Sequence, residues 1–279
     1  MPRRIKLTIE YDGTDFKGWQ VQCGGEAGAL LDTPSAERSP ERVRTVQGEI
    51  EKALRIIARQ PIRIAGASRT DAGVHALGQV ASFMLPDDVS TPTAELCQAF
   101  NGNMDKDVSA VKAEEVDAGF HPQRDATGKV YSYALFTRRE RSAYLRRTHW
   151  HVRFALNYAL MREGAKHLIG THDFTSFASK LAETQARREE DGKQALETVR
   201  EVRRIDVIED VNIPGCVLIK VEGSGFLYQM VRTIVGSLVD VGRGFRPPEW
   251  LGEALAARDR RKAGPTAPPH GLCLEKVFY

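Results

Sequence analysis

The sequence lacks any long apolar segment and any recognisable export signal. No apolar run in the 279 residues reaches the ~18 residues that a membrane-spanning helix needs. The residues after Met1 pass directly into an alternating pattern, without the apolar stretch of a signal peptide. We therefore expect a cytoplasmic protein with no membrane anchor.

Cysteine and histidine are too few and too scattered to suggest a metal site. No two of the four cysteines form a Cys-x-x-Cys pair, which argues against a thiolate zinc site and a disulfide framework. The seven histidines include His149 and His151, which lack acidic or thiolate neighbours. The sequence thus predicts no bound metal. The cysteines are Cys23, Cys97, Cys216 and Cys273.

The charge is nearly balanced, because 40 basic residues face 37 acidic ones and leave a net charge of +3. That excess alone does not identify a nucleic-acid-binding protein. Two local clusters could contact phosphates, although a solvated charged face is the simpler interpretation of either. They comprise Arg138, Arg139, Arg141, Arg146 and Arg147, and then Arg258, Arg260, Arg261 and Lys262.

Hydrophobic periodicity in the first half predicts alternating strands and helices. Alternate apolar residues predict a strand over 5–11, and apolar residues at helical spacing predict a helix over 46–57. A segment rich in Gly, Pro, Ser and Glu predicts a long surface loop over 23–44. Further strands are expected from Ile62, at 78–85 and at 108–116, with a helix at 93–101.

The second half gives a similar pattern. We expect helices near 156–168, 230–241 and 249–258, and a polar, mobile loop over 180–196. Strands are expected at 128–136, 198–208, 215–222 and 272–278.

Each half therefore runs strand, helix, two strands, helix, strand, the order of a split β-α-β unit used twice. This order predicts an α+β fold, a largely antiparallel sheet flanked by helices. We expect an N-terminal half at 1–118 and a C-terminal half at 119–279, with a central cleft as the binding site.

The most distinctive segment is a loop between two predicted strands that places Arg69 close to Asp71. It contains Gly66, Gly73 and Gly78, and loops on a rigid sheet are favoured positions for catalytic groups. An Arg-x-Asp pattern alone, however, is also typical of a local salt bridge.

The string Arg69-Thr70-Asp71-Ala72-Gly73-Val74-His75-Ala76 resembles the catalytic motif of the tRNA pseudouridine synthase A family. Other segments resemble that family in the same order along nearly the whole chain. Two departures are the long loop at 23–44 and the polar stretch at 180–196, which bear on which RNA is recognised. The matching segments are Tyr11-Asp12-Gly13-Thr14, Phe16, Gly18-Trp19-Gln20, Phe120-His121, Arg124, Tyr131, Tyr133, Asp173-Phe174-Thr175-Ser176-Phe177, Met230-Val231-Arg232 and Ile234-Val235-Gly236.

The resemblance implies an enzyme that isomerises uridine to pseudouridine in the anticodon stem-loop of tRNA, at positions 38, 39 and 40. It also implies a homodimer of the pseudouridine synthase fold, with an RNA-binding cleft. The isomerisation involves no redox change and no net hydrolysis, so no cofactor is expected.

The resemblance also assigns roles to four residues. Asp71 is the catalytic carboxylate, acting as a nucleophile or by taking a proton from the sugar. Arg232 would form an ion pair with Asp71 and orient it, and Tyr131 would stack on the target uracil. Tyr133 shares the face of Tyr131, so only the resemblance selects between them. Arg69 either fills the space left by the extruded uridine or is a structural partner of a carboxylate.

Three alternatives remain open from the sequence. A synthase of the same fold could act on another RNA, since the loop at 23–44 is unusual. An RNA-binding or folding-assistance module would not require Asp71. A nucleoside hydrolase could use one carboxylate, although such enzymes usually need a second carboxylate or a metal.

Overall fold

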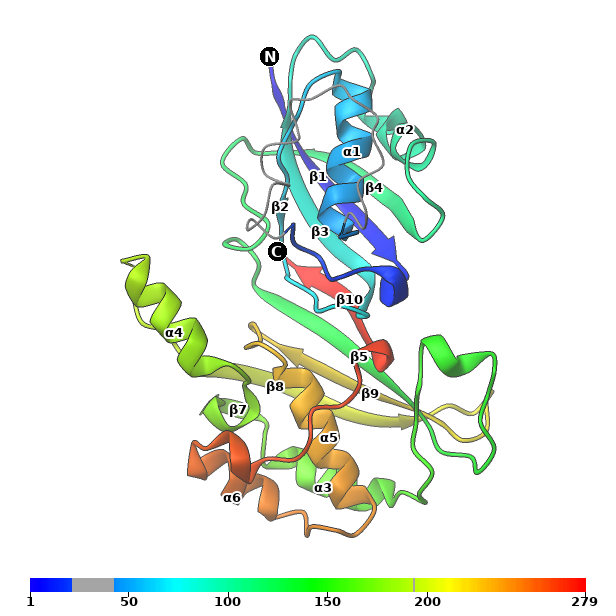
Figure 1. The fold of residues 1–279 in the computed structure, drawn as a ribbon, viewed down its shortest axis with the longest axis vertical. Helices are drawn as coiled ribbons and strands as arrows, with labels where there is room; N and C mark the ends of the chain where they lie inside the picture. Colours follow the sequence, from blue (N-terminus) through cyan, green and yellow to red (C-terminus); the bar gives the residue numbers. More distant parts are fainter. Residues whose placement is uncertain (22–42, 193) are drawn as a thin grey trace. The chain divides into compact units, whose positions relative to one another are not determined.

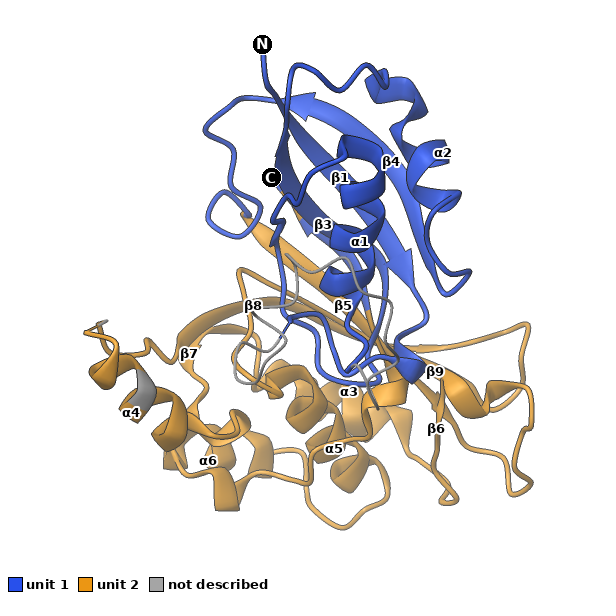
Figure 2. Ribbon diagram, turned by 45° about the horizontal axis from the view of Figure 1, so that its top comes forward, with its two compact units in different colours: residues 1–126, 274–277, 279 blue, residues 127–273, 278 orange. Residues whose placement is uncertain are grey.

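The computed structural model describes residues 1–21, 43–192 and 194–279. The described chain forms two compact units (Figures 1 and 2). Unit 1 contains Met1–Ala126, Leu274–Val277 and Tyr279, and unit 2 contains Thr127–Cys273 and Phe278. The loop predicted at 23–44 falls almost entirely outside the described residues. The domain limit expected between 118 and 119 stays a prediction.

Unit 1 follows the expected order of strand, helix, two strands, helix, strand. Its strands are adjacent in the order β4-β1-β3-β10, with β2 on β3, and β1 is antiparallel to both β3 and β4. Helices α1 and α2 pack against this sheet (Figure 1). The elements are β1 (Arg3–Tyr11), α1 (Val46–Ala58), β2 (Ala65–Gly66), β3 (His75–Leu85), α2 (Leu96–Asn101), β4 (Val108–Val116) and β10 (Leu272–Phe278).

Two strand limits differ from the sequence-based expectation. The strand expected from Ile62 is confined to Ala65–Gly66. The strand expected from residue 78 begins at His75, because Ala76 already pairs with Tyr11 of β1. Apolar periodicity does not reveal this early pairing, which depends on a partner distant in sequence.

The core of unit 1 includes buried apolar residues of strand β1 and helix α1. Ile5, Leu7 and Ile9 are fully buried on one face of β1, as the two-residue period of a strand requires. Ile50 and Leu54, four residues apart on α1, are also fully buried. The helix begins after Thr45, whose side chain accepts a hydrogen bond from the Gly48 amide.

Unit 2 has strand order β5-β9-β8-β7, with antiparallel neighbours, and β6 pairs in parallel with β5. Helices α3 and α5 pack on this sheet, and α6 packs on α3. The expected α+β class with a largely antiparallel sheet is confirmed. The elements are β5 (Gly128–Phe136), β6 (Trp150–His151), α3 (Tyr158–Lys166), β7 (Gly170–Asp173), α4 (Leu181–Glu190), β8 (Val199–Glu209), β9 (Cys216–Gly223), α5 (Met230–Gly242) and α6 (Trp250–Ala257).

The prediction of a polar loop over 180–196 is wrong for its first half, which forms α4. The segment is rich in Ala, Glu, Gln and Arg, all good helix formers, but it has no apolar stripe to mark a core-facing helix. Side chains within it support the helix locally. The Thr184 hydroxyl donates to the Lys180 carbonyl at 2.7 Å, and Gln185 donates to Glu189 at 2.9 Å.

Helix α5 is buried on nearly every side. Of its 13 residues only Arg232 is not buried. Gly236 allows the chain near Pro265 to cross the helix, since a Cβ at this position would lie 1.8 Å from the Pro265 carbonyl oxygen. The crossing segment is bonded to the helix by the Ala267 amide, which donates to the Arg232 carbonyl at 3.1 Å.

We predict that Gly236→Ala destabilises the protein by ~1–3 kcal/mol or more, because the new methyl group must displace backbone. Urea unfolding monitored by circular dichroism measures the change. Gly225→Ala is the matched control, because a Cβ at Gly225 would meet no atom within 4 Å. Equal stability of the two variants would contradict the close crossing.

Candidate active site

The loop that joins β2 to β3 carries Arg69 and Asp71 and is bonded to the segment that follows β1. The Trp19 amide donates to the Thr70 carbonyl at 3.0 Å, and the Gly73 amide donates to the Phe16 carbonyl at 3.3 Å. These bonds hold the backbone on either side of Asp71. The loop itself turns back through a bond from the Val74 amide to the Asp71 carbonyl at 3.2 Å.

Two glycines bring the segment after β1 into direct backbone contact with this loop. Gly18 has φ +96°, and a Cβ there would lie 2.8 Å from the Thr70 carbonyl oxygen and 3.3 Å from the Asp71 carbonyl carbon. At Gly13, a Cβ would lie 1.9 Å from the Val74 carbonyl oxygen. No other residue fits either position without moving the backbone that carries Asp71.

Side chains of β1 and β3 also form hydrogen bonds with this loop. The Tyr11 and Thr70 hydroxyls share a buried hydrogen bond of 2.7 Å. The side-chain amide of Gln79 donates to the Ser68 carbonyl at 2.7 Å, and its oxygen accepts from the Ser68 amide at 3.2 Å. Residues on both sides of Arg69 are therefore fixed to β1 and β3. Arg69 itself is exposed and Asp71 is partly exposed.

Trp19 belongs to the core that supports the loop. Its side chain is 3% exposed, and a Cβ at Gly66 would lie 2.5 Å from its indole ring. The Tyr11 ring lies beside it, with centroids 6.4 Å apart. Close packing of the indole on Gly66 fixes the start of the loop that carries Asp71.

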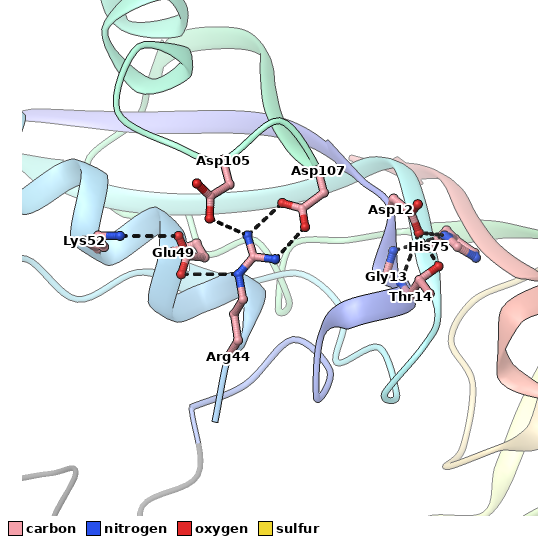
Figure 3. Close-up of polar contacts among 9 residues, drawn as sticks. All are labelled: Asp12, Gly13, Thr14, Arg44, Glu49, Lys52, His75, Asp105 and Asp107. Atoms are coloured by element: carbon pink, nitrogen blue, oxygen red, sulfur yellow. Dashed lines mark hydrogen bonds and ion pairs between the residues drawn. The ribbon is translucent and has the colours of Figure 1, made fainter. Parts of the chain in front are cut away.

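Asp12 and His75 shape the turn after β1 (Figure 3). The Asp12 carboxylate accepts from the Thr14 amide at 3.0 Å and from the Thr14 hydroxyl at 2.6 Å. Nδ1 of His75 lies 3.0 Å from the Gly13 amide nitrogen and 3.1 Å from the Asp12 carboxylate. The imidazole therefore joins the turn after β1 to the first residue of β3.

Arg44 fixes the other end of this segment (Figure 3). It donates to both carboxylate oxygens of Asp107, at 2.5 and 2.8 Å, and to Asp105 at 2.9 Å. The hydrogen bonds to Asp107 raise the pKa of Arg44 above its usual value. Its guanidinium also lies 4.3 Å from the Phe16 ring centroid, and its carbonyl accepts from the Lys17 amide at 2.9 Å.

Tyr131 and Tyr133 lie in unit 2, on one face of β5. Tyr131 is 6% exposed and meets the Phe226 ring edge-to-face at 5.4 Å. Tyr133 is fully buried, and its hydroxyl donates to the Pro268 carbonyl at 2.7 Å. The Tyr133 hydroxyl is therefore bonded inside the fold, and the stacking role of Tyr131 stays a prediction.

Arg232 lies in the first turn of α5, also in unit 2. Its Nε donates to the Ala267 carbonyl at 2.7 Å, which fixes the plane of the guanidinium. Burial raises the pKa of Tyr133, and the charge of Arg232 partly opposes that shift. The guanidinium and the tyrosine face of β5 are therefore electrostatic neighbours.

The structure thus places Asp71 and Arg69 together on one loop of unit 1, and Tyr131 and Arg232 together in unit 2. The catalytic roles of the four residues, and the ion pair of Asp71 with Arg232, stay predictions. Sequence reasoning missed Thr70 as a buried anchor of the loop. It also missed Gln79, whose only signal was a polar residue among the apolar positions of β3.

The described residues contain no group of three or more His, Cys, Asp or Glu side chains placed to hold a metal ion. None of the helices in the described ranges is long and apolar enough to cross a membrane.

Comparison with known proteins identifies the family. The chain matches the family described as tRNA pseudouridine synthase over residues 8–123 and 165–279. It is 42% identical to tRNA pseudouridine synthase A of Myxococcus xanthus, over 100% of this chain and 92% of that protein. It is 39% identical to the protein of the same name from Geobacter sulfurreducens, over 99% of this chain and 100% of that protein. A third relative, from Thermotoga maritima, is 40% identical over the same shares. A match of this extent, with the string from Arg69 to Ala76 intact, places the chain in the tRNA pseudouridine synthase family.

Proposed function

We propose that this protein isomerises uridine to pseudouridine in the anticodon stem-loop of tRNA, at positions 38, 39 and 40. The observation that carries the proposal is the loop at Asp71, a carboxylate held by backbone contacts with Gly13 and Gly18. Such fixed placement serves a group that must meet one atom of a substrate.

The reaction breaks the bond between N1 of uracil and the ribose, turns the detached base and joins its C5 to the same sugar carbon. The atoms of the substrate are conserved, and no electrons are gained or lost. One carboxylate therefore suffices, either as a nucleophile at the sugar or as a base that takes a proton from it. We assign this carboxylate to Asp71, and we propose no metal or cofactor.

The other residues would serve binding and orientation. We propose that Tyr131 stacks on the target uracil, since aromatic faces bind unpaired bases. Arg232 would pair with Asp71 and fix its direction, because a guanidinium can hold a carboxylate with two parallel hydrogen bonds. Arg69, exposed on the catalytic loop, would occupy the space left when the uridine leaves the stem, an extrusion that costs ~a few kcal/mol.

We further propose that the protein acts as a homodimer in the cytoplasm, with tRNA as its partner. Of the alternatives, hydrolysis of the glycosidic bond is disfavoured by the absence of another Asp or Glu from the described loop at 66–74.

Asp71→Asn should abolish isomerisation and change tRNA affinity by no more than about twofold, because affinity comes from many phosphate contacts. Pseudouridine formation and tRNA binding are measured on the same preparation. Asp87→Asn, an exposed change in unit 1, is the control and should retain activity. Substantial turnover by Asp71→Asn would remove Asp71 from the catalytic role.

Gly18→Ala should lower the single-turnover rate by about 10- to 100-fold, because the methyl group displaces the backbone on which Asp71 is carried. Binding of tRNA should change little. Gly102→Ala is the control, since its nearest contact, at 3.4 Å, is ordinary and its φ is negative. If the two variants react equally fast, the glycine contact does not position Asp71.

Arg232→Ala should reduce single-turnover chemistry by about 100-fold at saturating enzyme, with a much smaller loss of tRNA affinity. Arg232→Lys should recover only part of the rate, because an ammonium keeps the charge without the two-pronged geometry. A normal rate at saturation, with weaker binding and a shallower salt dependence, would instead make Arg232 a phosphate contact.

A further inference from the structure

Two basic side chains, Lys129 and Arg200, lie on the same sheet face as Tyr131. Lys129 pairs with Gly223 across β5 and β9, and Gly223 pairs with Val202 across β9 and β8. Directly paired residues of antiparallel strands project from the same face, and so do residues two apart on one strand. Lys129 therefore shares its face with Tyr131, and Arg200 shares it with Val202.

Gly223, on β9 between the two strands, is closely packed on this face. A Cβ there would lie 2.5 Å from the Glu201 carbonyl oxygen and 3.2 Å from the Phe226 ring. Phe226 in turn meets the Tyr131 ring edge-to-face at 5.4 Å. The aromatic pair that includes the proposed uracil-binding tyrosine thus lies next to the position opposite Lys129. Along β5, Lys129 and Tyr131 are separated by two residues, or about 6.6 Å.

The two cations are held where their charges are unfavourable. Burial lowers the pKa of Lys129 to about 8, and the charge of Arg200 acts in the same direction. Burial also lowers the pKa of Arg200, an effect that Glu197 opposes. Two like charges brought together and partly removed from water gain from an anion placed between them.

Two further arginines of β8 provide a comparison. Arg203 donates to Glu201 at 2.9 Å and to the Thr127 carbonyl at 2.9 Å. A register shift between Val202 and Arg204 pairs Arg204 with Glu222, so Arg204 is on the opposite face from Val202, where it lies 2.7 Å from Asp206.

We propose that Lys129 and Arg200 form a binding subsite for a backbone phosphate of the RNA, next to the nucleotide whose base stacks on Tyr131. The inference rests on the proposed function for the identity of that nucleotide. A phosphate offers several oxygen acceptors to a lysine and an arginine together, and it neutralises both cations at once. The subsite would position the extruded nucleotide by its backbone while Tyr131 holds its base.

Lys129→Gln and Arg200→Gln test the subsite by tRNA affinity at several salt concentrations. Each should weaken binding about tenfold and reduce the slope of log affinity against log salt by about 1. Lys129→Arg should retain both values. Arg204→Gln, which removes the same charge from the opposite face, is the matched control and should leave both unchanged.

A second measurement uses tRNA with a neutral methylphosphonate on either side of the target uridine. One of these substitutions should weaken binding to the unaltered protein about tenfold. The same substitution should not further weaken binding to Lys129→Gln, because that variant already lacks the contact with the phosphate. The loss of affinity of the unaltered protein for the methylphosphonate tRNA is measured without any variant. It therefore tests the phosphate subsite even if Lys129→Gln fails to fold.

Normal affinity and salt slope in Lys129→Gln and Arg200→Gln would overturn the proposal, and so would indifference of the unaltered protein to both neutral phosphates. These readouts require no turnover, so they are separate from the proposed reaction. Pseudouridine formation by the unaltered protein, assayed in parallel, distinguishes the two. If the unaltered protein forms pseudouridine and the variants bind tRNA normally, only the phosphate subsite is contradicted. If the variants show the expected loss of binding but the unaltered protein forms no pseudouridine, only the proposed reaction is contradicted.

Discussion

The placement of Asp71 depends on one backbone contact, between the segment after β1 and the loop that joins β2 to β3. Gly13 and Gly18 allow the two stretches of backbone to approach more closely than any side chain permits. The hydrogen bonds from Trp19 and to Phe16, and the buried pair of Tyr11 with Thr70, depend on that approach. The backbone at Asp71 is therefore positioned by the core of unit 1, which is the condition for the proposed catalysis by orientation.

In unit 2 the proposed functional side chains lie on a helix and a strand. Arg232 occupies the one position of α5 that is not buried, and the surrounding helix is packed on nearly every side. The crossing of Gly236 by the 265–267 segment brings the Ala267 carbonyl to the Arg232 side chain. Tyr131 and Lys129 share a strand whose register with β9 is regular over its whole length. Rigid elements thus carry the proposed functional groups of unit 2, while a loop carries Asp71 and Arg69 of unit 1.

Elements with a clear period could be predicted from the sequence, and elements that depend on distant partners could not. The alternation of β1 and the helical spacing of α1 and α5 gave their positions within a few residues. Helix α4 was missed because its residues favour a helix without marking a buried face. The string from Arg69 to Ala76 indicated the loop that we propose to be catalytic, but the roles of Gln79 and Thr70 depend on contacts with residues distant in the chain or across the loop. The sequence did not single out Lys129, because a lysine in a strand normally indicates a solvent-exposed position. Only the packing around it shows that it is partly buried.

The most direct test of the account is to map pseudouridine in unmodified tRNA transcripts after incubation with the pure protein and no added cofactor. The account predicts new pseudouridine at positions 38, 39 and 40 wherever uridine occurs there, with no release of free uracil. Pseudouridine confined to other positions would contradict the proposed substrate, and release of uracil without pseudouridine would contradict the reaction itself.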